Sequence, residues 1–427
     1  MKTILNPAQK DWSSILQRPT KTVDDIEATV NQVFGDVQKN GDTAVNKYTQ
    51  LFDGVTLENN LVSSSEIEEA NKLISSELKE AIITAQKNIT AFHLAQKTKK
   101  VFVETTNGVE CWQEMRPIQK VGLYIPGGTA PLFSTVLMLA IPAQIAGCKE
   151  IVLCSPPNKK GKIHPAILFA ANLCGVTKII KVGGIQAVAG LTFGTKAIPQ
   201  VYKIFGPGNQ FVTVAKQLAT KYGVAIDMPA GPSELLVVAD DSAKASYVAS
   251  DLLSQAEHGA DSQVILVSTS QKLIDEVAVE IDKQLLALPR IEIAKKAIEN
   301  SKSILVANNE IALALINEYG PEHFIVCTNN NDYYIDNIAN AGSVFIGNYT
   351  PESAGDYASG TNHTLPTNGF SKAYSGVNLD SFTKSITFQK ISKEGIQNIG
   401  NAIEIMAEAE GLQAHKNAVT IRLKDLK

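Results

Sequence analysis

The sequence predicts an α/β protein made of two doubly wound, Rossmann-like units, with a helical N-terminal segment and a C-terminal tail. Short apolar runs alternate with helix-like segments twice, from residue 121 to 209 and again from 234 to about 347. This alternation is typical of parallel sheets that are covered by helices on both faces. The first hundred residues instead carry helix caps and the apolar periodicity of helices.

The predicted elements follow one another in a simple order. Helices are expected over 22–38 and 64–96, and the turn pair Asn107-Gly108 between two strand-like runs predicts a β-hairpin. The first unit takes its strands from "VGLYIPGG", "EIVLCSPP", "KIIKVGG" and "VYKIFGPGN". The second takes them from "ELLVVAD", "QVILVST", "SILVAN", "FIVCT" and "SVFIGN". A long aperiodic loop follows, and the tail from about Asp380 is predicted to form a short strand and helices.

The length argues for several domains, because 427 residues exceed what a single hydrophobic core usually supports. No repeat of fixed short period and no low-complexity tract is present. We expect an N-terminal arm (1–21), a discontinuous first α/β domain (22–123 with 234–379), a second, Rossmann-like α/β domain (124–233) and a C-terminal tail (380–427).

The composition excludes some classes of function. Charged residues make up 19% of the chain and the net charge is only −4, so no basic field is available to hold nucleic acid or an anionic membrane. The most apolar stretch, "VLMLAIP", is interrupted by Pro142 far short of a membrane span, and the N-terminus "MKTILNPAQKDW" has no secretory apolar core. We therefore expect a soluble, cytoplasmic protein that binds a small molecule.

The cysteines are expected to be reduced thiols without a catalytic role. Their number is odd and they include no C-x-x-C pair. Two of them, Cys154 and Cys327, lie in strand-like runs, where cysteine usually acts as a small hydrophobe. The remaining three are Cys111, Cys148 and Cys174.

Two glycine-rich loops are candidates for ligand binding. "YIPGGTAP" (124–131) and "FGPGN" (205–209) each follow a strand and precede a helix. In parallel sheets, loops at the carboxyl ends of strands bind ligands, and backbone N–H groups there can approach a phosphate or ribose closely. Neither loop has the G-x-G-x-x-G pattern of dinucleotide sites, so nucleotide binding and ordinary turns both stay open.

The stretch "DLLSQAEHGAD" suggests a polar site at the end of a helix. Val248, Leu252 and Gln255 have the spacing of one apolar stripe, so the Gln255 carboxamide would face inward and need a partner. His258 lies three residues later on nearly the same face. Glutamine oxygen, histidine nitrogen and a carboxylate together could bind zinc. An imidazolium that complements the helix dipole is the alternative for His258.

Three further places gather polar chemistry. Adjacent Glu322 and His323 follow a helix stop and precede a strand, where they could form an acid/base pair or a solvated turn. The long loop "GNYTPESAGDYASGTNHTLP" carries Asp356 and His363, and loops of this length are usually functional or disordered. In the tail, His415 follows Glu410 around a glycine and could equally be a surface residue at a helix end.

Six motifs in register identify the chain as resembling the histidinol dehydrogenase family. The resemblance runs from about residue 22 to 425 and departs from the family's pattern at no functional position. The motifs are "VGLYIPGGTAPLFSTVLMLAIPAQIAGC", "GPGNQFVTVAK", "DMPAGPSELLV", "LLSQAEHGADSQ", "YGPEHFI" and "SAGDYASGTNHTLPT".

The resemblance implies residue roles that the pattern alone could not assign. It implies one catalytic zinc per subunit and NAD+ as cofactor, in an intertwined homodimer whose tail, with Glu410 and His415, reaches the partner's site. The implied zinc ligands are Gln255, His258, Asp356 and His415, and the implied catalytic pair is Glu322 and His323. These six residues, with Ser233 and Glu410, would contact the substrate. The implied NAD+ contacts are Tyr124, Gln186 and Asn209.

The implied reaction is the four-electron oxidation of L-histidinol, through L-histidinal, to L-histidine, the last step of histidine biosynthesis. His323 would act as general base and Glu322 would activate water, while zinc would orient the substrate. A zinc hydrolase, in which Glu322 activates metal-bound water and the glycine loops are only turns, is a competing interpretation. A catalytically inactive module that binds imidazole ligands is a third, disfavoured because every chemical position is filled.

Overall fold

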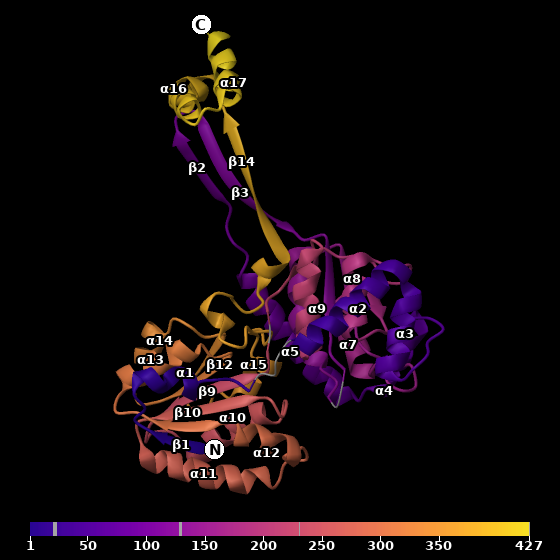
Figure 1. Ribbon diagram of the computed structural model, residues 1–427, viewed down its shortest axis with the longest axis vertical. Coiled ribbons are helices and arrows are strands. Elements are labelled where there is room, and N and C mark those ends of the chain that lie inside the picture. Colours follow the sequence, from indigo (N-terminus) through magenta and orange to yellow (C-terminus); the bar gives the residue numbers. More distant parts are fainter. Residues whose placement is uncertain (20–23, 128–129, 230, 427) are drawn as a thin grey trace. The chain divides into compact units, whose positions relative to one another are not determined.

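The computed structural model describes residues 1–19, 24–127, 130–229 and 231–426. The chain divides into two compact units (Figure 1). Unit 1 comprises residues 1–95 and 118–382, and unit 2 comprises residues 96–117 and 383–427. No helix in the described parts of the chain is long and apolar enough to cross a membrane.

One half of unit 1 is built on a five-stranded parallel sheet in the order β6-β5-β4-β7-β8. After the central strand β4, the chain adds β5 and β6 on one side of it and then β7 and β8 on the other. The strand order therefore reverses between β4 and β7, which makes a doubly wound sheet. The strands are β4 (Lys120–Tyr124), β5 (Glu150–Cys154), β6 (Lys178–Ile180), β7 (Lys203–Phe205) and β8 (Ala225–Ile226).

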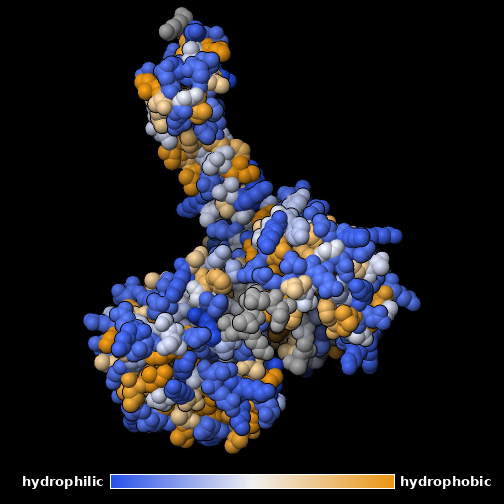
Figure 2. All heavy atoms as spheres, viewed as in Figure 1, coloured by the Kyte–Doolittle hydropathy of each residue, from blue (hydrophilic) through white to orange (hydrophobic). Residues whose placement is uncertain are grey.

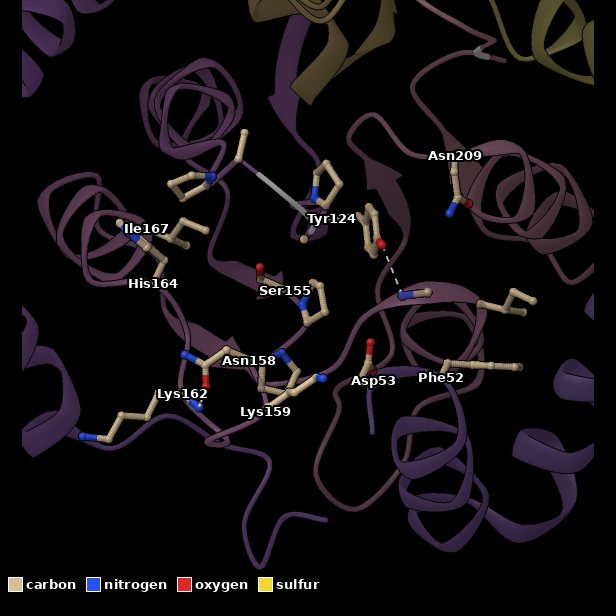
Figure 3. A pocket seen from close by; sticks show the side chains of 18 of the residues that line it. Phe52, Asp53, Tyr124, Ser155, Asn158, Lys159, Lys162, His164, Ile167 and Asn209 are labelled. Carbon is tan, nitrogen blue, oxygen red and sulfur yellow. Dashed lines mark hydrogen bonds between the residues drawn. The ribbon is translucent and has the colours of Figure 1, made fainter. Parts of the chain in front are cut away.

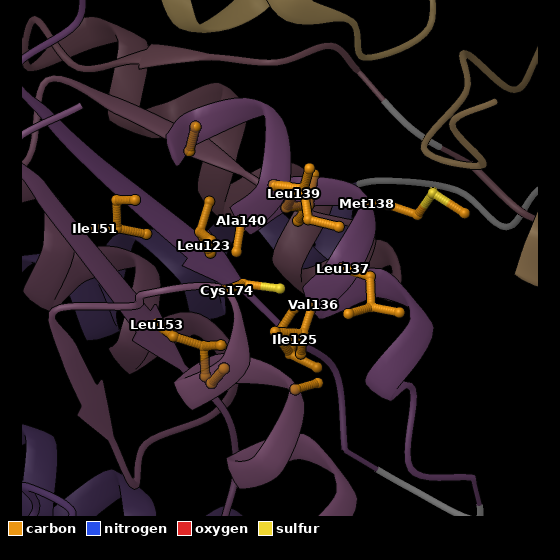
Figure 4. Packing of buried hydrophobic residues seen from close by; sticks show 14 of the residues in the cluster. Leu123, Ile125, Val136, Leu137, Met138, Leu139, Ala140, Ile151, Leu153 and Cys174 are labelled. Atoms are coloured by element: carbon orange, nitrogen blue, oxygen red, sulfur yellow. The ribbon is translucent and has the colours of Figure 1, made fainter. Parts of the chain in front are cut away.

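Helices cover both faces of this sheet, as the alternating pattern predicts. On one face, α4 (Ser64–Leu73), α5 (Ser76–Ala95), α6 (Phe133–Ala146) and α7 (Pro165–Leu173) enclose a core (Figure 4). On the other lie α2 (Asp24–Asn40), α3 (Asp42–Asp53), α8 (Gly184–Phe193) and α9 (Gln210–Lys221). Helix α6 is apolar all round because it lies between the sheet and further helices, and ten of its residues are buried.

The other half of unit 1 is built on a six-stranded parallel sheet in the order β1-β11-β10-β9-β12-β13. Its strand order reverses between β9 and β12, so it is also doubly wound. Its strands are β1 (Lys2–Leu5), β9 (Glu234–Ala239), β10 (Gln263–Ser268), β11 (Lys302–Leu305), β12 (His323–Cys327) and β13 (Ser343–Ile346). One face packs against α10 (Ala245–Ala256), α11 (Gln271–Leu285) and α12 (Ile291–Glu299). The other packs against α1 (Trp12–Ile15), α13 (Asn309–Tyr319) and α14 (Asn331–Asn337).

The predicted fold class is confirmed, but the sheets divide the chain differently from the predicted domains. The segment 22–123 was expected to join 234–379, whereas α2 to α5 and β4 belong to the five-stranded sheet and its cores. The arm 1–21 instead contributes β1, which pairs with β11 along its full length. Local periodicity predicted α2, and α4 with α5 as a single helix, but it predicted neither α3 nor β1. It also carries no information on which sheet a helix covers.

Unit 2 is a three-stranded antiparallel ribbon with two helices. The strands lie in the order β14-β3-β2, and the Asn107-Gly108 hairpin joins β2 to β3 as predicted. Gly108 has a φ of 78°, the left-handed conformation that this turn requires. The elements are β2 (Val101–Thr106), β3 (Val109–Pro117), β14 (Thr383–Ile391), α16 (Lys393–Ala409) and α17 (Gln413–Lys424). Except for its first three residues, the predicted tail lies in this unit.

The long loop after β13 carries a short helix, α15 (Glu352–Tyr357). The remaining segments are the 3-10 turns η1 (Gln9–Asp11), η2 (Phe370–Lys372) and η3 (Leu379–Phe382). All five cysteines are free, and the thiols of Cys154 and Cys327 are buried in strands as predicted.

Candidate functional site

A cavity of about 1070 Å³ opens beside the strand-order reversal of the five-stranded sheet. Its lining includes the end of β4, the start of α8 and the end of α3 (Figure 3). Doubly wound sheets bind ligands at this point, because the loops diverge there and leave a crevice. The volume is at the upper end for small-molecule sites, as a dinucleotide requires.

Two of the three predicted cofactor contacts, Tyr124 and Asn209, line this cavity. The hydroxyl of Tyr124 accepts a hydrogen bond of 3.1 Å from the Gly184 amide, and burial raises the pKa of Tyr124 to about 12. The third predicted contact, Gln186, is fully buried, and its Oε1 has no hydrogen-bond partner in the described part of the chain. The Asn209 side chain caps α9 through the Val212 amide, so it also has a structural role.

The loop that follows β7 is held in one conformation by buried charges. Gly206 has a φ of 124°, and a Cβ at this position would lie 2.0 Å from the Tyr124 carbonyl oxygen. The Gly206 amide donates to Asp227, and its carbonyl oxygen accepts from Lys216 at 2.8 Å. Lys216 and Asp227 also form a buried ion pair. A glycine-rich loop of this kind can bring the main chain close to a bound nucleotide.

A second polar site lies at the amino ends of β9 and β12 in the six-stranded sheet. Helix α10 returns the chain from the carboxyl to the amino ends of the strands, so Gln255 and His258 at its end lie on this side. His323 is the first residue of β12, and Glu322 precedes it. The predicted pair therefore lies in a buried cluster and not in a solvated turn.

The hydrogen bonding of His323 leaves one imidazole nitrogen free. Nδ1 lies 3.2 Å from the main-chain oxygen of Glu234. Because a carbonyl oxygen can only accept, Nδ1 carries the proton in the neutral ring. Nε2 is buried without a hydrogen-bond partner among the residues described, and it lies 3.6 Å from Oδ1 of Asp356. Nε2 is therefore available to a ligand or a proton.

Carboxylates surround this imidazole and set its charge. Glu352 and Asp356 are four residues apart on one face of α15, and their oxygens lie 3.7 and 3.6 Å from the His323 ring nitrogens. Burial lowers the pKa of His323, but Glu352, Glu322 and Asp356 outweigh it and raise this pKa to about 10. Burial raises the pKa of Glu322 to about 8, with the charge of His323 opposing it.

The same cluster has the donor set of a metal site. The ligand atoms of His323, Glu352 and Asp356 all lie within 4.8 Å of one another. Gln255 is fully buried, and its amide nitrogen can donate to Oε2 of Glu352 at 3.2 Å, which leaves its oxygen for another partner. The His258 side chain reaches solvent, but the protein around its ring removes part of its hydration and so lowers its pKa. The negative charge of Asp356 opposes this lowering. The amide oxygen of Gln255, the imidazole of His258 and the carboxylate of Asp356 are donors that fit a zinc ion, beside the His323 imidazole.

The comparisons with known proteins agree with this chemistry. The family model for histidinol dehydrogenase matches residues 16–423. This chain belongs to the histidinol dehydrogenase family. The histidinol dehydrogenase of Bacteroides thetaiotaomicron is 59% identical over the whole of both chains, and that of Haemophilus influenzae is 51% identical, also over the whole of both.

Solved structures extend the comparison to the fold. The crystal structure of histidinol dehydrogenase from Elizabethkingia anophelis is 56% identical and superposes with a TM-score of 0.98, covering 100% of this chain and 98% of that one. An acetylating aldehyde dehydrogenase from Geobacillus thermoglucosidasius, 14% identical with a TM-score of 0.50 over 89% of this chain and 94% of that one, is similar in fold alone.

The structure brings some of the family's predicted site residues together and leaves others in unit 2. Gln255, His258 and Asp356 gather around the Glu322–His323 pair, and Ser233 lies directly before β9. Glu410 ends α16 and His415 lies in the first turn of α17, both exposed.

Two residues of the cluster were missing from the predicted site. Glu352 lies four residues before Asp356, a spacing that places both on one helix face and could have indicated it. His363 was noticed only as part of the loop. Its Nε2 lies 3.1 Å from the Thr135 hydroxyl, and its Nδ1 lies 3.0 Å from the Asp356 carbonyl oxygen. Thr135 is in the first turn of α6, so His363 connects the polar cluster with the helix that follows the loop 125–132.

Proposed function

We propose that this protein oxidises L-histidinol through L-histidinal to L-histidine, with zinc bound and NAD+ as the oxidant. The observation that carries the proposal is the buried Glu322–His323 pair, whose free Nε2 lies among metal-binding side chains. Membership of the histidinol dehydrogenase family supports the substrate. The cavity beside β4 and β7 supports a dinucleotide cofactor.

The residues of the two sites divide into three roles. Bound zinc supplies a template for the imidazole and amine of the substrate, and bound NAD+ supplies the hydride acceptor. Gln255, His258 and Asp356 would hold the metal together with His415 of a second copy of the chain. Tyr124, Gln186 and Asn209 would hold the cofactor, and Ser233 with Glu410 would complete the substrate site.

His323 moves the proton in the first oxidation. Nδ1 is committed to the Glu234 carbonyl oxygen, so in the neutral ring Nε2 accepts the hydroxyl proton of histidinol as the carbon–hydrogen bond gives up its hydride. A bound zinc ion would favour the neutral ring, because its charge would offset the carboxylates that raise the pKa of His323. The product of this half-reaction is the aldehyde. The carboxylates around His323 stabilise the imidazolium that forms.

Glu322 acts in the second oxidation, which consumes water. Its carboxylate takes a proton from the water that adds to the aldehyde, and His323 takes the hydroxyl proton of the resulting diol as the second hydride leaves. In total, one histidinol, two NAD+ and one water give one histidine carboxylate, two NADH and three protons. This route forms no covalent thioester and therefore assigns no catalytic role to the five free cysteines.

A second copy of the chain is the partner that completes the site. Unit 2 exposes apolar side chains (Figure 2), and in α17 only Val419 is buried. A surface of this kind is usually covered by a partner. The exposed apolar residues are Val101, Phe102, Val103, Ile386, Ile391, Ile405, Met406, Leu412 and Ile421. A homodimer formed through unit 2 would let Glu410 and His415 reach the other subunit.

A cytoplasmic location of the protein stays a prediction.

The test is to incubate zinc-loaded protein with L-histidinol and NAD+ and to follow reduced-cofactor absorbance and histidine. We expect two NADH per histidine. His323→Asn should lower turnover of both histidinol and histidinal by about 10² to 10⁴-fold, whereas Glu322→Gln should slow mainly the oxidation of histidinal. Equal damage by Glu322→Gln to both half-reactions would contradict the division of roles. Absence of NADH formation with hydrolysis of an amide would instead favour the zinc hydrolase.

A further inference from the structure

A buried ion pair lies directly behind the catalytic pair, and neither of its members was among the predicted site residues. Arg18 belongs to the N-terminal arm and Glu234 is the first residue of β9. The guanidinium binds the carboxylate with two nitrogens, Nε to Oε1 and Nη2 to Oε2 at 2.8 Å. The side chain of Glu234 is 2% exposed and that of Arg18 is 15% exposed.

The pair is held from several directions. Nη2 of Arg18 also donates to the Tyr319 carbonyl oxygen at 2.9 Å, and its guanidinium lies 4.0 Å from the centre of the Tyr319 ring. Oε1 of Glu234 accepts a further hydrogen bond of 2.7 Å from the main-chain N–H of Asn368. Two N–H donors in a rigid planar group, with a stacked ring behind them, allow one orientation of the carboxylate.

The main chain of Glu234 in turn holds both catalytic side chains. Its amide donates to Oε2 of Glu322 at 2.8 Å, and its carbonyl oxygen accepts from Nδ1 of His323. The residue before it is Ser233, a proposed substrate contact. One residue therefore anchors the water-activating carboxylate and sets the tautomer of the imidazole.

We infer that Arg18 is a positioning residue for the oxidation: by locking Glu234 it aims Glu322 and His323 at the substrate. The inference rests on the proposed function, because it assigns Arg18 a role in that reaction. If Arg18 only fastened the arm to the sheet, its loss would weaken folding without changing turnover in the folded enzyme. If it positions the pair, its loss misaligns proton transfer, and misplacement by about 1 Å can lower a rate by about 10²-fold.

The test compares Arg18→Met with a control that loosens the same arm elsewhere. Lys302 donates to the Ile15 carbonyl oxygen, three residues before Arg18, and does not touch Glu234. We expect Arg18→Met to lower kcat per zinc-loaded site by about 30-fold or more, with KM for histidinol changed by less than about threefold. Lys302→Met should lower the melting temperature and keep kcat within about twofold.

Two further variants cover the case in which Arg18→Met does not fold. Arg18→Lys keeps the charge but not the two-nitrogen contact, and we expect a kcat about 5- to 10-fold lower than that of the wild type. Arg18→Ala should regain kcat in millimolar guanidinium, whereas Lys302→Met should not respond.

Unchanged kcat in Arg18→Met or Arg18→Lys, or an equal loss in Lys302→Met, would overturn the positioning role. Failure of the wild-type enzyme to oxidise histidinol would instead overturn the proposed function, so the two failures are distinguishable.

Discussion

Individual side chains in both sites are buried with part of their hydrogen-bonding capacity unused. Gln186 Oε1 and His323 Nε2 are buried without a partner among the residues described. A polar atom left in this state costs about 1 to 3 kcal/mol. The proposed cofactor would give Gln186 Oε1 a partner, and the hydroxyl of the proposed substrate would give His323 Nε2 one. The folded chain therefore keeps unfavourable polar groups where ligands are expected.

Removing one proposed zinc ligand should remove the metal and leave the fold intact. His258 is exposed at the end of α10, so His258→Ala creates no cavity in the core. We expect zinc affinity to fall by at least about 10²-fold with little change in melting temperature. Metal analysis of the purified variant measures this, with His164→Ala, which lines the other cavity, as control. Full zinc occupancy in His258→Ala would exclude it as a ligand.

Asp53, which lines the large cavity, makes the stability of the folded chain depend on pH. Burial raises its pKa from 3.8 to about 6. Because this pKa is higher in the folded than in the unfolded chain, the group's contribution to stability falls as pH rises from about 4 to 6. Asp53→Asn should therefore raise the melting temperature at pH 8 relative to wild type, and much less at pH 4.

A second aspartate provides a control of opposite sign. Tyr48 and Lys47 bond to the Asp36 carboxylate and lower its pKa, so the ionised form is favoured in the folded chain. Asp36→Asn should lower the melting temperature at pH 8 and have less effect in acid, where wild type also loses the charge. Thermal melts of Asp53→Asn, Asp36→Asn and the wild type between pH 4 and pH 8 test both expectations. A loss of stability at pH 8 in Asp53→Asn would contradict the proposed cost of its charge.

At the scale of elements, the two sheets use opposite ends for their sites. The cofactor cavity lies at the carboxyl ends of β4 and β7, as the general rule for doubly wound sheets predicts. The polar cluster lies at the amino ends of β9 and β12, where α10 ends and where Glu322 precedes its strand. The carboxyl-end rule therefore locates the first site and not the second.

The loop after β7 should tolerate no side chain at Gly206. A Cβ would meet the Tyr124 carbonyl oxygen at 2.0 Å, and φ is 124°. Gly206→Ala must move the main chain at the cavity, so we expect a loss of at least about 2 kcal/mol in unfolding free energy and a raised KM for NAD+.

Gly223→Ala is the matched control for this loop. Gly223 has a φ of 82°, but a Cβ there has nothing within 4 Å. Only the backbone strain applies, about 1 kcal/mol, and KM for NAD+ should not change. Chemical denaturation and steady-state kinetics of both variants separate strain from close approach. Equal effects of the two substitutions would show that the contact with Tyr124 is unimportant.

At the scale of the whole molecule, one unit has four hydrophobic core clusters, one on each face of its two sheets, and the other unit has very little core. Unit 1 buries both sheets between helices. In unit 2, α16 buries only Gly395, Gly400 and Ala407. A small unit of this kind usually needs a partner for stability. The shared site of a homodimer would give unit 2 both a partner and a function.

Mixed dimers test the shared site directly. If His415 serves the partner's site, co-expressed His258→Ala and His415→Ala chains give heterodimers with one doubly defective and one intact site. Random pairing then restores about a quarter of wild-type activity, because half the dimers are mixed and half their sites are intact. Activity no higher than that of the separate variants, in a sample that contains heterodimer, would exclude sharing.

The sequence by itself determined most helices and strands, the loop 205–209, the Asn107-Gly108 hairpin and the polarity of the segments that carry Gln255, His258, Glu322 and His323. It did not predict β1, α3 or α15, and part of the loop 124–131 lies outside the described residues. These features are local, because periodicity, caps and turns depend on neighbours a few residues away. Only the tertiary structure decided that β1 joins the far edge of the six-stranded sheet and that α2 to α5 cover the other sheet. It also decided that Arg18 meets Glu234, a contact across 216 residues of chain. Contacts of this kind depend on which faces pack together, and the pattern of one segment does not contain that information.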